Sequence, residues 1–274
     1  MFYNEFSNEF KLVDKECLLI SNGFASGLTN LRKANIENKG LFYTSFFQLS
    51  MAIERICKLA LGINNYSLTG EFLTLKEMKN LGHDIDKLLR MVQSKIPCEI
   101  TQINDNVVSK EVVKLLNNFA RSTRYYNLDL LAGGVDLGND PLDCWINEVI
   151  PLAYRFIIES NPRLNSSIKR KIERHGEMYK SIENLSNIFY ISIDGGTLEN
   201  NAKEFKMIYE VTPYLIIEIA NIIKPIIEYM DSIIKNNYKG GLELPYVREY
   251  FYHNILLEDQ FLLTRKKYRV LITD

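Results

Sequence analysis

Apolar side chains recur at steps of three and four residues along much of this chain, and this period constrains the fold more than any other feature. Between residues 44 and 61 the recurring positions are Phe46, Leu49, Ile53, Ile56 and Ala60. That spacing places them on one face of an α-helix. Gly62 and the polar stretch after it are expected to end the helix.

Two further segments show the same period, at residues 83–95 and 109–126. Pro97 is expected to follow the end of the first, and Ser109 is expected to cap the start of the second. We predict that these two helices pack with the helix at residues 44–61 as one bundle. Further helices are expected from Pro141 or Asp143 to about Glu159, over the basic residues 168–187, and from Tyr209 to Asn236 with a kink at Pro225.

Short β elements are expected in two places. The stretch IFYISIDGG, residues 188–196, is apolar and β-branched and precedes a turn, and the tail 247–274 is expected to form a helix and then a short strand. The sequence therefore predicts a mainly α fold with a break near residues 160–165. A helical bundle is expected over residues 1–160, and a mostly helical region that carries a short β element over residues 161–274.

Charge and composition exclude several classes of protein. The formal net charge of -1 argues against a protein that coats nucleic acid by bulk charge, although it leaves room for a local basic patch. The N-terminus carries acids where a signal peptide needs a basic and then an apolar run. The apolar run at residues 214–227 is interrupted by Glu218 and Lys224, so no membrane span is expected.

The four cysteines lie far apart and lack metal-ligand spacing. Cys17, Cys57 and Cys144 have apolar neighbours, which favours buried free thiols in a reducing compartment. A cytoplasmic location is therefore expected. In the loop near residue 136 the acids Asp136, Asp140 and Asp143 lack a full oxygen-ligand pattern, so neither a metal nor a cofactor is expected there.

Candidate binding residues lie near helix ends. His83 is expected to bond a carbonyl or Glu54, or alternatively to contact a nucleotide at the positive end of a helix. Glu54 and Lys58, four residues apart, are expected to form an ion pair. The pair Arg121 and Arg124, followed by Tyr125, suits phosphate binding and base stacking, or equally ion pairs with Asp84 or Asp129.

Three of these stretches occur in the order found in a known superfamily. FFQLSMAIERICKLALG carries Glu54 and Lys58, LGHDIDKLL follows it, and FARSTRYYNLD ends the next helix. Over about residues 40–130 the chain resembles the HEPN superfamily, whose bundles carry an acid-and-lysine helix, a GHDL-like turn and an RYP-like helix end. Residues 165–274 show no such resemblance.

The resemblance implies a helical bundle that often dimerises. Many HEPN proteins are metal-independent ribonucleases of toxin–antitoxin or anti-phage systems, and others bind only nucleotides or protein partners. Their catalytic signature is an arginine followed four to six residues later by a histidine. This chain departs from the signature, because no histidine follows Arg121 or Arg124 at that spacing.

Two literal matches to the signature lie elsewhere, at Arg170–His175 in RKIERH and at Arg248–His253 in REYFYH. A histidine can accept a proton from a ribose hydroxyl, and an arginine can stabilise charge on the scissile phosphate. On a continuous helix a five-residue step places the two side chains about 140° apart. The arginine and histidine of each pair can therefore act on one phosphate only if they lie at a helix end or meet across a dimer interface.

We expect one of two functions. The first is a HEPN-like ribonuclease of a bacterial toxin–antitoxin or anti-phage system, with RNA as substrate, a homodimer as the assembly, and an antitoxin or defence subunit as possible partner. His253 is preferred over His175 because its aromatic neighbours can fix the ring, and the basic segment 264–269 lies close behind it. The alternative is a non-enzymatic nucleotide-binding or scaffold protein that uses Arg121, Arg124 and His83.

Overall fold

The computed structural model describes residues 6–35, 38–134, 138–185, 197–238, 241 and 243–269. This part of the chain is mainly helical and contains no strand, which confirms the predicted fold class. The short strand expected at residues 188–196 and the last residues of the tail, 270–274, lie outside the described residues.

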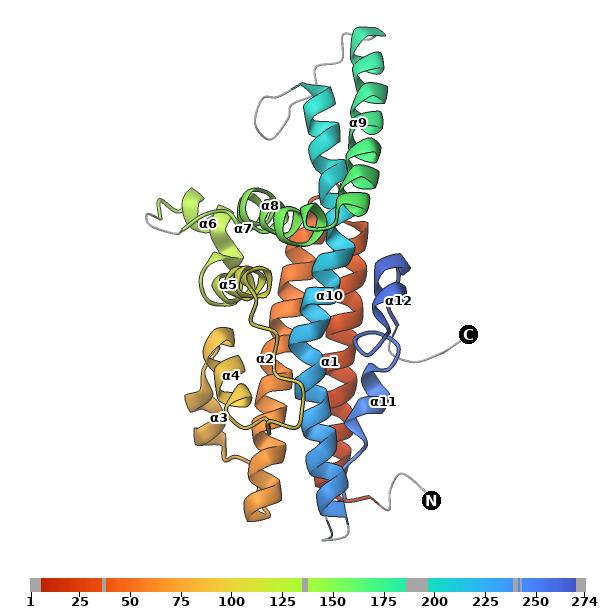
Figure 1. Ribbon diagram of the computed structural model, residues 1–274. Helices are drawn as coiled ribbons and strands as arrows, with labels where there is room; N and C mark the ends of the chain where they lie inside the picture. Colours follow the sequence, from red (N-terminus) through yellow and green to blue (C-terminus); the bar gives the residue numbers. More distant parts are fainter. Residues whose placement is uncertain are drawn as a thin grey trace.

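Three long helices lie side by side and form the body of the molecule (Figure 1): α1 (Asn8–Lys33), α2 (Gly40–Thr69) and α10 (Leu198–Asn237). The sequence did not predict α1, and α10 begins at Leu198 rather than at Tyr209. Thr197 caps α10, because its side chain accepts a hydrogen bond from the backbone N–H of Asn200. A single helix of 40 residues therefore crosses the whole molecule.

The three predicted bundle helices contact one another as expected: α2, α4 (Ile85–Gln93) and α5 (Val107–Arg121). Several expected boundaries were wrong, and α5 ends at Arg121 instead of residue 126. Helix α2 continues through Gly62 because that glycine is buried against the Phe72 ring, and packing outweighs its low helix propensity. The N-cap of α5 is Asn106, which accepts from the Ser109 N–H at 2.8 Å, so Ser109 lies inside the helix.

The other helices attach to this body. They are α3 (Leu75–Leu81), α6 (Tyr126–Leu131), α7 (Pro141–Cys144), α8 (Ile150–Ala153), α9 (Pro162–Leu185), α11 (Val247–Phe251) and α12 (Asp259–Thr264). Wider π-helical turns at Trp145–Val149 and Tyr154–Glu159 join α7 and α8 into the helix predicted from Pro141 to Glu159. Pro151 lacks a backbone N–H, which favours such irregular turns beside it.

Ion pairs dock the basic helix α9 on the first part of α10. Lys171 Nζ lies 2.9 Å from Glu210 Oε2, and Lys203 Nζ lies 2.7 Å from Glu173 Oε2. Figure 1 shows the two helices running together past the ends of α1 and α2. These pairs join lysines of each helix to carboxylates of the other and so fix α9 against α10.

One hydrophobic core contains side chains from both predicted regions. It runs from Val13 on α1 to Tyr268 in the tail and includes Trp145, Ile216 and Phe251. The predicted break falls between Glu159 and Pro162, where α9 begins. The division into regions 1–160 and 161–274 stays a prediction, although α10 packs directly on α1 and α2.

Glycine allows α1 and α2 to approach closely. A Cβ on Gly27 would lie 2.8 Å from Leu49 Cγ, and the Gly27 carbonyl accepts a hydrogen bond from Ser45 Oγ at 2.8 Å. Leu49 is fully buried, so it cannot move aside into solvent. The contact therefore requires a residue without a side chain.

We expect Gly27→Val to lower the free energy of unfolding by about 2 kcal/mol, because it overpacks the α1–α2 contact. Gly40→Val is the matched control, since a Cβ on Gly40 meets no atom within 4 Å. Thermal unfolding followed by circular dichroism at 222 nm measures both variants. Equal melting temperatures for the two would contradict the close contact.

Candidate functional site

Arg248 and His253, one of the two predicted arginine–histidine pairs, line the same cavity. Its volume is about 470 Å³, and it lies between the last turns of α10 and α11. The other residues that line it are Asp231, Lys235, Tyr246, Glu249 and Tyr252. We call this cavity the α10–α11 pocket.

The end of α11 explains how a five-residue step brings these two side chains to one cavity. Helix α11 ends at Phe251, so Arg248 lies on the helix and His253 lies in the turn that follows. The separation of about 140° applies only within a continuous helix. Arg248 and His253 therefore lie at a helix end, which is one of the two arrangements expected to bring such a pair together.

Buried contacts fix the backbone of the turn that carries His253. Asn254 is fully buried, and its Nδ2 donates to Ser21 Oγ at 2.8 Å and to the Arg269 carbonyl at 3.3 Å. The guanidinium of Arg265 donates to the His253 carbonyl at 3.1 Å. On the other side of the turn, Phe251 packs edge-on against Phe24 of α1. The histidine thus stands on a backbone tied to α1 and to the tail.

The walls of the pocket combine both signs of charge with aromatic rings. Asp231 is 4% exposed and pairs with Lys235, whose Nζ lies 2.6 Å from Oδ2. No donor among the described residues reaches Asp231 Oδ1, which is buried in the wall. The Tyr252 ring meets the His253 ring edge-on, with centroids 5.2 Å apart. A half-buried imidazole, two cations and two tyrosines therefore face one opening.

The other pair is held apart. Arg170 and His175 both lie within the continuous helix α9, so about 140° separates their side chains. His175 packs edge-on against Tyr179, at 5.0 Å between centroids. Burial lowers the pKa of His175, and the charge of Lys206 lowers it further. Arg170 is exposed, and its Nε donates to the Ser166 carbonyl of its own helix at 3.4 Å.

The HEPN-like residues are engaged with one another. His83 Nδ1 lies 2.9 Å from Glu54 Oε1, which is the structural contact expected for it. The expected pair of Lys58 with Glu54 is present at 2.8 Å on the same oxygen. His83 remains 76% exposed at its side chain, so this contact orients the ring at the surface without burying it.

The arginines of the RYP-like stretch also have partners in the protein. Arg121 Nη1 lies 2.8 Å from Asp84 Oδ2, one of the two acids expected for it. The guanidinium of Arg124 lies over the Phe47 ring at 5.0 Å, and its Nε is buried without a partner in the described residues. Tyr125 is 60% exposed. A phosphate contact by Arg121, Arg124, Tyr125 or His83 stays a prediction.

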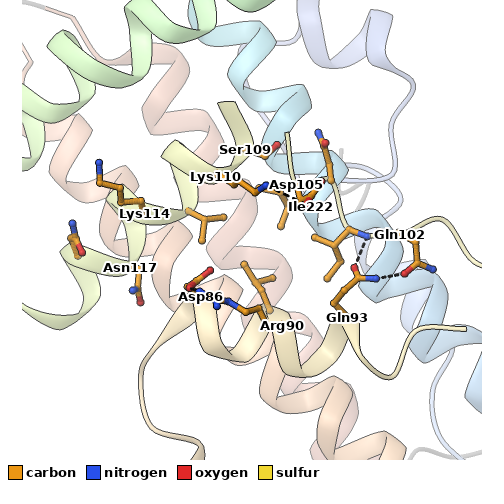
Figure 2. Close-up of a pocket in the computed structure, with 15 residues that line it drawn as sticks. Asp86, Arg90, Gln93, Gln102, Asp105, Ser109, Lys110, Lys114, Asn117 and Ile222 are labelled. Carbon is orange, nitrogen blue, oxygen red and sulfur yellow. Dashed lines mark hydrogen bonds and ion pairs between the residues drawn. The ribbon is translucent and has the colours of Figure 1, made fainter. Parts of the chain in front are cut away.

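A second cavity, of about 850 Å³, was not foreseen from the sequence (Figure 2). Helix α4 supplies Asp86, Arg90 and Gln93 to its wall, and α5 supplies the residues Lys110, Lys114 and Asn117, while residues 102–105 close one side. The lining residues come from separate elements, and no motif joins them. We call it the α4–α5 pocket.

Other predicted site features have simple structural explanations. Asp140 caps α7 and accepts a hydrogen bond from the Tyr43 hydroxyl at 2.7 Å, whereas Asp136 lies outside the described residues. Within the described ranges no group of three or more His, Cys, Asp or Glu side chains is arranged to hold a metal ion. The four thiols are unpaired, and burial raises the pKa of both Cys17 and Cys57.

A search of the described helices for one long and apolar enough to cross a membrane found none. Comparison of the chain with protein-family models, with curated proteins and with solved structures gave no match. The HEPN assignment therefore stays a resemblance based on the order of motifs.

Substitution of Asp84 tests whether the HEPN-like turn LGHDIDKLL has a structural role. It caps α4 by accepting from the Lys87 N–H at 3.0 Å, and it also pairs with Arg121. We expect Asp84→Ala to lower the free energy of unfolding by about 1–2 kcal/mol, because both contacts are lost. Asp86→Ala, in the first turn of the same helix, removes an exposed pair with Arg90 and should cost less. Urea unfolding measures the two variants, and a larger loss for Asp86→Ala would refute this assignment.

Proposed function

We propose that this protein binds RNA in the α10–α11 pocket and cleaves it without a metal ion. The observation that supports the proposal is the convergence of Arg248 and His253 on one cavity together with Lys235 and two tyrosines. Proton transfer and phosphate stabilisation are the two functions that such cleavage requires. The side chains of this pocket supply both.

The reaction is an attack of a ribose 2′-hydroxyl on the adjacent phosphorus. His253 accepts the hydroxyl proton as the new bond between the 2′-oxygen and phosphorus forms. The bond from phosphorus to the 5′-oxygen breaks, and that oxygen takes a proton from the imidazolium or from water. The products are a 2′,3′-cyclic phosphate and a 5′-hydroxyl. Arg248 stabilises the negative charge that builds up on the phosphoryl oxygens.

The remaining pocket residues suit the binding of a nucleotide chain. Tyr246 and Tyr252 are 44% and 59% exposed, so their rings are available for base stacking. The fixed turn around Asn254 limits the positions that the imidazole can adopt, and catalysis depends on such fixed geometry. Tyr252 restricts one side of the ring further.

The biological setting of this activity is proposed from the HEPN resemblance. Ribonucleases of that superfamily serve in toxin–antitoxin and anti-phage systems, which favours a cytoplasmic protein that acts as a homodimer under the control of a partner subunit. The exposed HEPN-like surface around His83 and Tyr125 is available for such a partner.

A second candidate function is nucleotide binding in the α4–α5 pocket. Its lining combines the buried apolar side chains Leu89, Val113 and Ile222 with amides and three cations. Figure 2 shows Arg90, Lys110 and Lys114 around the same pocket. An apolar lining accommodates a nucleobase, amides can bond the base edge, and the cations suit phosphates. Of the cations, Lys110 pairs with Asp105 at 3.3 Å, and Asp105 is 86% exposed. Such an exposed ion pair is weak enough for a phosphate to displace.

We expect Lys110→Glu to weaken binding of ATP or GTP at least about tenfold, because it replaces an attractive charge with a repulsive one. Lys76→Glu on α3, an exposed site with the same change of charge, should bind as the wild type does. Isothermal titration measures both. Equal affinity for the two variants, or no binding by the wild type, would exclude a nucleotide from this pocket.

His253→Ala should reduce RNA cleavage at least about 100-fold, because it removes the general base. His175→Ala is the matched control and should keep most of the activity, since α9 holds that ring apart from Arg170. Labelled single-stranded RNA is incubated with each purified variant in EDTA, and the fragments are resolved on a gel. The 2′,3′-cyclic phosphate end is verified by mass spectrometry.

The melting temperatures of the variants show whether loss of activity reflects loss of fold. Full activity in His253→Ala would remove the α10–α11 pocket from consideration. Absence of cleavage by the wild type on every RNA tested would favour the nucleotide-binding function instead.

A further inference from the structure

Three cations surround the ring of Tyr209 on α10. The guanidinium carbon of Arg32 lies 5.2 Å from the ring centroid, Lys206 Nζ lies at 4.9 Å and Lys266 Nζ at 5.9 Å. They come from α1, from α10 and from the tail, which are far apart in the sequence. We call these four residues the Tyr209 cluster.

Arg32 is a buried cation whose partners among the described residues are neutral. It is 6% exposed, and it donates through Nε to the Arg265 carbonyl at 3.2 Å and through Nη1 to the Tyr209 carbonyl at 3.5 Å. Pro213 has no N–H to donate to that carbonyl, which leaves it open to Arg32. Among the described residues no carboxylate pairs with Arg32, although buried cations are usually paired.

The tail adds further positive charge to the same surface. Tyr268 fixes the tail to α1, because its N–H donates to Thr29 Oγ1 at 2.9 Å and its ring is buried. Lys266, Lys267 and Arg269, on either side of it, are exposed. None of the three pairs with a carboxylate within the described ranges.

Among the described residues, acidic neighbours do not balance this charge. The carboxylate found at the cluster is Glu210, which lies 2.8 Å from Lys206 Nζ and 2.9 Å from Lys171 Nζ. Burial raises the pKa of the Tyr209 hydroxyl, but a hydrogen bond from Lys266 and the charges of Arg32 and Lys206 outweigh it and lower the pKa. The surroundings of the ring therefore favour negative charge.

We propose that the Tyr209 cluster binds the phosphates of single-stranded RNA, with a base stacked on the Tyr209 ring. Tyr209 is 37% exposed, and aromatic rings among cations are the usual elements of single-strand binding surfaces. The inference rests on the proposed function, since the strand bound here is the one that enters the α10–α11 pocket.

The positions of the Tyr209 cluster and the α10–α11 pocket would allow one RNA strand to contact both. Tyr209 and Asp231 lie on the same helix, about 33 Å apart along its axis at about 1.5 Å per residue. Figure 1 shows α11 and α12 following one another on the same side of α1 and α10. Arg265 connects the sites, because its guanidinium bonds the His253 carbonyl and its own carbonyl accepts from Arg32.

The test measures RNA affinity by fluorescence anisotropy in the His253→Ala background, so that the probe stays intact. The probes are labelled oligouridines of about 4 and about 16 nucleotides, which span the usual range of single-strand site sizes. The variants are Lys266→Glu, Tyr209→Leu and the distant control Lys76→Glu. Lys266 and Lys76 are both exposed, so neither substitution disturbs the core.

Lys266→Glu and Tyr209→Leu should each weaken binding of the longer RNA at least about tenfold. The affinity for RNA falls as salt rises, and Lys266→Glu should make this dependence weaker. The slope of log affinity against log salt should become less negative by about 1, as expected for one lost phosphate contact. Lys76→Glu should leave affinity and slope unchanged. A smaller loss for the shorter RNA would support a strand that spans both sites.

The possible results distinguish failure of the Tyr209 cluster from failure of the proposed cleavage. Equal affinities for Lys266→Glu and Lys76→Glu would overturn the cluster while leaving cleavage at His253 intact. Binding that depends on the cluster, without cleavage by the wild type, would uphold the cluster and refute the catalytic proposal. Binding of the wild type to phosphatidylserine vesicles but to neither RNA would overturn the cluster as an RNA surface.

Discussion

The burial of α10 against α1 and α2 is the interaction on which the rest of the structure depends. Its apolar side chains Leu215, Ile219, Ile223 and Met230 are fully buried. Each buried aliphatic side chain of this size contributes about 1.5–3 kcal/mol. The same helix docks α9 through ion pairs, and its Glu218 accepts hydrogen bonds from Asn104 and Ser109. Both cavities and the Tyr209 cluster include residues of α10.

The apolar period was sufficient to predict the bundle helices but not all long helices. In α2, α4 and α5 large aliphatic and aromatic residues recur along the buried stripe at the helical period, although α2 also buries Ser45 and Gly62. The stripe of α1 instead includes Ser21, Gly27 and buried Arg32, which resemble breaks in a helical pattern. Gly27 is needed for the close approach to α2 at Leu49, whereas Ser21 and Arg32 bond the C-terminal segment and α10. Helix α1 therefore depends on tertiary packing, which helix propensities of single residues do not describe.

The candidate sites were predictable only where neighbours in sequence are also neighbours in space. Arg248 and His253 are close in the chain, but their convergence depends on a helix that ends after five residues. Asp231 and Lys235 come to the same pocket from another helix, and no motif indicates this. The α4–α5 pocket and the Tyr209 cluster combine distant segments, so only the fold reveals them.

Pro213 illustrates how a residue that is unfavourable in a helix can help to position a charged side chain, here that of Arg32. A proline within a helix costs about 3 kcal/mol relative to alanine in isolation. Here the backbone oxygen left without a helical donor accepts from Arg32, and a cation thereby lies beneath a tyrosine at the surface. Selection for thermal stability alone would favour replacement of this proline. In this chain, however, the same proline leaves free the backbone oxygen that holds a buried cation beside Tyr209.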